Sequence, residues 1–119
     1  MQGVGCPSGT NYFDERDTML SNAGVSDATL LGVAGDTDAP TPARYRALRM
    51  LERRNGSFDA DTVRWLVTDE SEAVLVRAAA LALLAGSEQP SLREEARLLA
   101  EGLGSHADKR LARLTNRYR

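Results

Sequence analysis

The stretch Asp69–Gly86, DESEAVLVRAAALALLAG, decides the fold of this chain. Between Ala73 and Ala85 its only charged residue is Arg77. A helix that is apolar on all sides is buried on most of its faces. The stretch is shorter than the about 20 apolar residues that a membrane span needs. We therefore expect a helix that is covered by other helices of the chain or by a partner.

The composition fits one all-α domain. The chain has 119 residues, which is enough for a single domain. Aromatic residues make up only 5% of the chain and hydrophobic residues 42%, so the core has to be built from Ala, Leu and Val. This composition favours close helix packing over a β-sandwich or a barrel, in which aromatic and β-branched residues dominate.

Capping and turn residues divide the chain into helices joined by short loops. The glycine-rich residues 1–12 are interpreted as an extended arm, residues 14–23 as a weak helix, and the residues after Ser26 as a short helix ending near Ala34. After a linker, five helices are predicted over residues 42–54, 59–68, 71–86, 91–104 and 105–119, with N-caps at Thr41, Asp59, Asp69, Ser91 and Ser105. The expected division is an acidic N-terminal arm, residues 1–41, and a helical domain, residues 42–119.

Short loops make consecutive helices antiparallel neighbours. Helix 42–54 should therefore pair with helix 59–68, and helix 71–86 with helix 91–104, as two αα-hairpins. Hairpins in tandem are the start of an α-solenoid, although fewer than three repeats are marginally stable alone.

The stretch Val63–Leu84 resembles a HEAT repeat, in which an L-x-x-L-x-D turn precedes V-R-x-x-A-x-x-A-L. The matching residues are Leu66, Asp69, Val76, Arg77, Ala80 and Leu83. The resemblance covers residues 42–104 and implies a HEAT-like stack, with an irregular helical bundle as the alternative. It also implies that Asp69 and Arg77 brace adjacent repeats, although the spacing between them is longer than is usual in the family.

Few side chains suggest chemistry. Cys6 and His106 are the only thiol and the only imidazole, and they are interpreted as a passive thiol and a histidine in the first turn of a helix. One Cys and one His cannot build a closed zinc site without several carboxylates, and Asp36 and Asp38 fit a solvated loop. We therefore expect no catalytic residue, no cofactor and no metal. Trp65, the only indole, is predicted to lie in the core.

Charge is distributed unevenly along the chain. Residues 1–41 carry six acids and one base, and residues 42–119 carry 14 bases and 11 acids, which together give the net charge of −2. This balance argues against bulk nucleic-acid binding, which is usual for clearly basic domains. Helix 42–54 holds a basic set that points around several faces, namely Arg44, Arg46, Arg49, Arg53 and Arg54.

The last helix carries the sharpest functional signal. Its basic residues fall on one face, opposite an apolar face of Ala107, Leu111, Leu114 and Tyr118, and they are Lys109, Arg110, Arg113, Arg117 and Arg119. Such a face either is solvated and complements the helix dipole, or docks a phosphate backbone or an acidic protein patch.

These observations predict a non-enzymatic adaptor for protein–protein interaction, or a structural subunit of a larger assembly. Protein partners or self-association are expected. A small virion protein, such as a phage connector, is a narrower version, and nucleic-acid binding through the last helix is the alternative. The chain shows no signal peptide or membrane span, so a cytoplasmic or virion location is expected.

Overall fold

The computed structural model describes residues 25–119. The N-terminal arm, the weak helix over residues 14–23 and Cys6 lie outside these residues. Within them the chain forms six α-helices, a final 3-10 turn and no strand, which confirms the all-α prediction. The elements are α2 (Asp27–Gly35), α3 (Thr41–Arg53), α4 (Ala60–Thr68), α5 (Val74–Ala85), α6 (Pro90–Leu103), α7 (Lys109–Thr115) and η2 (Asn116–Tyr118).

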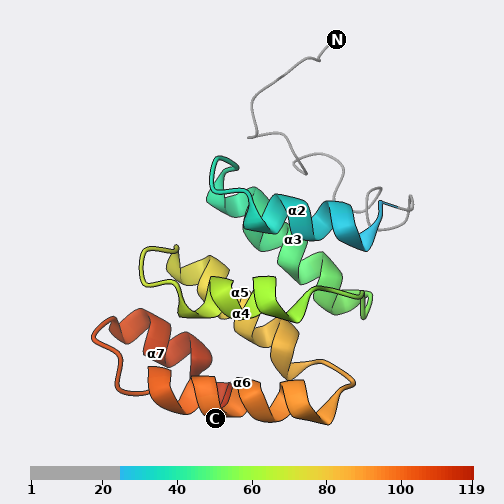
Figure 1. Cartoon of the computed structure of the whole chain (residues 1–119). Coiled ribbons are helices and arrows are strands. Elements are labelled where there is room, and N and C mark those ends of the chain that lie inside the picture. Colours follow the sequence, from blue (N-terminus) through green and yellow to red (C-terminus); the bar gives the residue numbers. More distant parts are fainter. Residues whose placement is uncertain (1–24) are drawn as a thin grey trace.

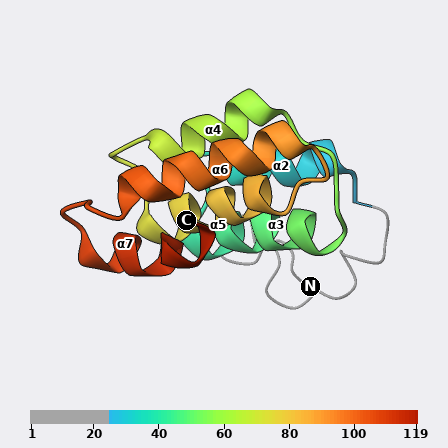
Figure 2. The ribbon, with the colours of Figure 1, turned by 90° about the horizontal axis from the view of Figure 1, so that it is seen from below.

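The helices form three hairpins that stack in a row (Figure 1). The hairpins are α2 with α3, α4 with α5, and α6 with α7. Figure 2 looks along the stack and shows two layers, with α2, α4 and α6 in one and α3, α5 and α7 in the other. Helix α5 lies at the centre and packs against α3, α4, α6 and α7.

The predicted hairpins are shifted by one helix along the chain. The chain pairs α2 with α3 and α4 with α5, whereas the prediction paired the helices that are now α3 and α4. The reason is that α2 looked like part of the N-terminal arm, so the count of hairpins began one helix too late. In the structure α2 packs on α3, with Leu30 and Ala34 fully buried.

The hairpins repeat at a spacing of 33 positions, except at α7. Helices α2 and α4 begin 33 positions apart, and so do α3 and α5. The same spacing relates the buried pairs of the first layer, which are Leu30 and Ala34, Val63 and Val67, and Ala96 and Ala100. In the second layer it relates Ala43 and Ala47 of α3 to Val76 and Ala80 of α5. In α7 the equivalent buried residues, Leu111 and Thr115, follow those of α5 by 35 positions.

The apolar helix α5 is buried, as predicted. Every residue of α5 from Val76 to Leu84 is buried except Ala78, and Arg77 is only 3% exposed. The helix ends at Gly86, as expected. The caps at Ser26 and Asp59 are also confirmed, because their side chains accept hydrogen bonds from the backbone N–H groups of Thr29 and Thr62.

Two predicted capping boxes are wrong for a shared reason, namely that another residue begins the helix. The Asp69 carboxylate accepts hydrogen bonds from Ser71 and ends α4, so α5 begins only at Val74. Pro90 begins α6, since its missing N–H costs nothing in the first turn. Ser91 therefore lies inside the helix.

Candidate interaction surface

Buried arginines hold the hairpins together. The Arg44 side chain is 5% exposed, and its Nε donates to the Ala34 carbonyl at 2.9 Å. Its two terminal nitrogens donate to the Glu72 carboxylate at 2.8 and 2.5 Å. Glu72 belongs to the turn of the next hairpin, so this bidentate pair joins the first two hairpins.

Arg77 repeats the first part of this arrangement 33 positions later. Its Nε donates to the Val67 carbonyl at 2.9 Å, and a terminal nitrogen lies 3.5 Å from Glu70. The Glu70 carboxylate also contacts His106 Nε2 at 2.9 Å, which joins the second hairpin to the third. The hydrogen bond from His106 lowers the pKa of Glu70, and the charges of Arg77 and His106 lower it further. His106 therefore has a structural partner within the stack.

The five predicted binding residues, Lys109, Arg110, Arg113, Arg117 and Arg119, are all exposed. None of their side chains lies within ion-pair distance of a carboxylate in residues 25–119. The Arg117 guanidinium lies over the Tyr118 ring, 5.5 Å from its centroid. Unpaired positive charges thus lie together on α7 and on the turn that follows it.

The apolar side of α7 differs from the prediction. Asp108, rather than Ser105, caps the helix, and its carboxylate accepts the N–H groups of Arg110 and Leu111. The helix therefore starts later than predicted. Its buried residues are Leu111 and Thr115, whereas Leu114 is 36% exposed.

Two of the three arginines on α4 and α6 are paired with carboxylates. On α4, Arg64 bonds to Asp61 at 2.5 Å and to Glu95 of α6, and these hydrogen bonds raise its pKa, the bond to Glu95 more than the bond to Asp61. On α6, Arg97 bonds to glutamates one turn to either side, whereas Arg93 donates to the Ser87 carbonyl. The charges of Arg64 and Arg97 are therefore neutralised locally, and those of the α7 cations are not.

The register places the α7 arginines in line with an exposed strip of α5. Leu75, Ala78 and Ala85 are the partly exposed residues of α5 beyond its first position, Val74. Since the buried residues of α7 follow those of α5 by 35 positions, Arg110 and Arg113 correspond to Leu75 and Ala78. Figure 2 shows α5 between α3 and α7 in one layer.

The same register adds Tyr45 and Arg49 of α3. The Arg49 guanidinium lies over the Tyr45 ring, 5.9 Å from its centroid, and is 3.3 Å from Glu52. We call the whole surface the α3–α5–α7 face, made of Tyr45, Arg49, Leu75, Ala78, Ala82, Ala85, Arg110, Arg113 and Arg117.

Trp65, which was predicted to be buried, lies on the opposite layer. It is 50% exposed, because α4 turns Val63, Leu66 and Val67 toward the core and leaves Trp65 on the other side of the helix. Leu98 of α6, 33 positions later, is 54% exposed. The single indole is therefore a surface residue.

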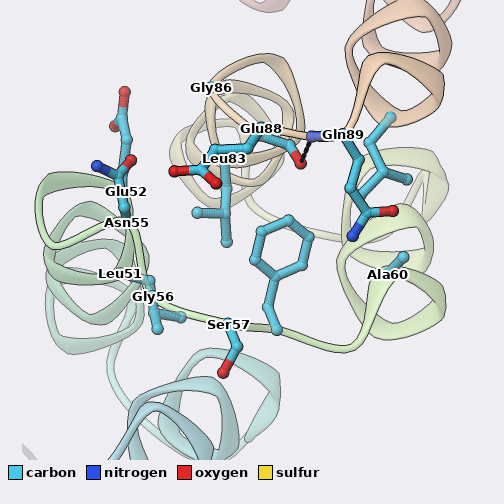
Figure 3. Close-up of a pocket in the computed structure, with 13 residues that line it drawn as sticks. Leu51, Glu52, Asn55, Gly56, Ser57, Ala60, Leu83, Gly86, Glu88 and Gln89 are labelled. Carbon is cyan, nitrogen blue, oxygen red and sulfur yellow. Dashed lines mark hydrogen bonds between the residues drawn. The ribbon is translucent and has the colours of Figure 1, made fainter.

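A cavity of about 450 Å³ lies between the segments that link successive hairpins. Figure 3 shows Glu52 and Asn55 on one side, Leu83 and Gly86 on another, and Gln89 and Ala60 on the third. The Gln89 N–H donates to the Ser87 hydroxyl at 3.0 Å. Two carboxylates, Glu52 and Glu88, line the cavity without an imidazole, thiol or lysine beside them.

No cluster of three or more potential metal ligands occurs within residues 25–119. Asp36 and Asp38 belong to one turn, in which the Asp36 carboxylate accepts the Asp38 N–H at 2.9 Å. None of the helices described here combines the length and the apolar composition of a membrane span. Comparisons with protein-family models, curated proteins and solved structures find no match to the chain.

Proposed function

We propose that this protein is a non-enzymatic adaptor that binds a protein partner on the α3–α5–α7 face. The observation that supports it is the line of Arg110, Arg113 and Arg117, which have no carboxylate partner within residues 25–119, beside a partly exposed apolar strip on α5. Protein interfaces combine apolar contact with arginine and aromatic side chains, and both are present here.

The apolar strip favours a protein over a nucleic acid. A surface that only follows a phosphate backbone needs cations along its length. On the α3–α5–α7 face, α5 contributes only Leu and Ala, and this strip separates the α7 arginines from those beside Tyr45 on α3, which are Arg46, Arg49 and Arg53. The positive charge is thus interrupted by an apolar strip, which suits an acidic partner that also has an apolar surface.

The adaptor role is tested by recovering partners of the tagged full chain from its native source, with and without nuclease. We expect a stoichiometric protein partner that survives nuclease treatment. The variant R113A/R117A should lose this partner, because it removes two of the three arginines that lie beside the α5 strip.

The matched control is R93A/R97A, which removes two exposed arginines from α6 in the other layer. This control should retain the partner. If nuclease releases everything that is bound, or if both variants behave alike, the proposed adaptor surface is wrong.

A further inference from the structure

Most of the exposed strip of α5 is alanine. Ala78 and Ala85 are partly exposed and Ala82 is 4% exposed, so side chains of one carbon cover this side of α5 between α3 and α7. The distance between packed helices depends on the side chains at the contact, and it is smallest where these are small. Another helix can therefore approach α5 closely here and place its larger apolar side chains over the alanines, as knobs enter holes in a coiled coil.

The charges of α7 continue into η2. Arg110 and Arg113 are three positions apart on α7, a rise of about 4.5 Å along the axis, and Arg117 follows on η2, where each residue rises about 2 Å. Carboxylates three positions apart on a neighbouring helix are also separated by about 4.5 Å. A helix that runs beside α7 can therefore offer an acceptor to Arg110 and to Arg113, with bidentate geometry available to each pair, and a further acceptor toward Arg117.

Together these features specify the occupant of the face. We infer that the partner's docking element is an amphipathic helix whose apolar stripe packs on Leu75, Ala78 and Ala85 and whose flanking acidic residues pair with the α7 arginines. This is the helix-in-groove mode of recognition. The inference rests on the proposed adaptor function and specifies which part of the partner binds.

The test uses the full chain and three labelled probes in fluorescence-anisotropy titrations. The first probe is a synthetic peptide of about 20 residues, long enough to form a helix, with leucines at helical spacing and glutamates flanking them. The second has the same composition in scrambled order, so that its leucines do not form a stripe. The third is a single-stranded oligonucleotide of about 20 nucleotides, whose phosphates test the nucleic-acid alternative.

We expect the amphipathic peptide to bind saturably. The affinity of the scrambled peptide should be lower by about tenfold or more. A78F should weaken binding of the amphipathic peptide by about tenfold or more, because the ring fills the space above the alanines. Its control is A28F, which places the same ring on the exposed side of α2 in the other layer and should leave binding unchanged. Circular-dichroism melting of both variants establishes that each is folded.

The other outcomes overturn the inference in distinguishable ways. Equal binding of both peptides would show that charge alone is recognised, and no binding of either would show that the face does not accept such a helix. In both cases a nuclease-resistant partner in the native source would leave the adaptor function standing. Preferential binding of the oligonucleotide, steeply weakened by salt and lost in R113A/R117A, would overturn the inference and the adaptor function together.

Discussion

At the scale of single residues, the buried pair of Arg44 and Glu72 joins two successive hairpins through side chains 28 positions apart. Both side chains are about 5% exposed. Replacing Arg44 by Met would leave the Glu72 carboxylate buried without its partner, which costs about 3–5 kcal/mol of unfolding free energy. Urea denaturation of R44M should show this loss. R97M, which removes exposed ion pairs within one helix, should change the unfolding free energy by less than about 1 kcal/mol.

Glu70 makes stability depend on acid pH. Its pKa lies below the ordinary value of 4.5, mainly because His106 hydrogen-bonds to it. A carboxyl with a lower pKa in the folded state than in the unfolded chain stabilises folding above about pH 4.5, and this contribution disappears as the pH falls through its folded pKa.

We therefore predict that E70Q loses less unfolding free energy than the parent chain between about pH 7 and about pH 3, as measured by urea denaturation at each pH. E88Q is the control, because it removes an exposed carboxyl that has no ion pair in the part of the chain described here. An E70Q profile identical to that of the parent would mean that Glu70 does not bridge the hairpins in solution.

Residue types alone predicted the local features only in part, since the caps expected at Asp69, Ser91 and Ser105 are wrong because other residues begin those helices. The caps at Ser26 and Asp59 depend on neighbours within three positions, and they are confirmed. The burial of Trp65 depends on which side of α4 meets the core, and the expectation that it lies in the core with Val63 and Val67 is wrong. The spacing of Val63, Leu66 and Val67 was the better signal, because these residues share one helical face.

At the scale of elements, the linker after α3 has no space for a side chain at Gly56. A Cβ there would lie 2.7 Å from the Asp27 carboxylate and 2.9 Å from Leu51 Cδ2. The Asp27 carboxylate is itself held by the N–H and hydroxyl of Ser57, and Leu51 is fully buried, so neither can retreat freely.

We predict that G56A lowers the unfolding free energy by about 1–3 kcal/mol, as overpacking does. The control is G102A in α6, where a Cβ meets nothing within 4 Å. That variant should raise the unfolding free energy by about 0.5–1 kcal/mol, because Ala favours the helix over Gly. Urea denaturation measures both changes, and a stable G56A would contradict the packing of this linker.

The main error at this scale was the choice of which two consecutive helices form each hairpin. Capping residues locate helices but do not say which two consecutive helices form a hairpin. The repeated arginines at positions 44 and 77 carry that information, since each donates to a carbonyl of the preceding helix. The 33-residue spacing between them was available in the sequence as a signal for the pairs α2–α3 and α4–α5.

At the scale of the whole molecule, the described chain holds three stacked hairpins rather than two. The expectation that partners are needed because a two-hairpin stack is marginal therefore loses its basis. The case for a partner depends instead on the difference between the layers: Arg64 of α4 and Arg97 of α6 are paired with carboxylates, and Arg110 and Arg113 of α7 are not. The sequence predicted the basic side of α7, but the alanine strip beside it follows only from how the hairpins stack.

The central claim is that a protein docks on the α3–α5–α7 face, and site-specific photo-crosslinking in the native source tests it most directly. A benzoylphenylalanine placed at Tyr45, where an aromatic ring already lies on the face, should form a covalent adduct that protease removes and nuclease does not. The same group at Ala28, on the exposed side of the other layer, should form none. Equal adducts at both positions, no adduct at Tyr45, or an adduct sensitive to nuclease would contradict the account.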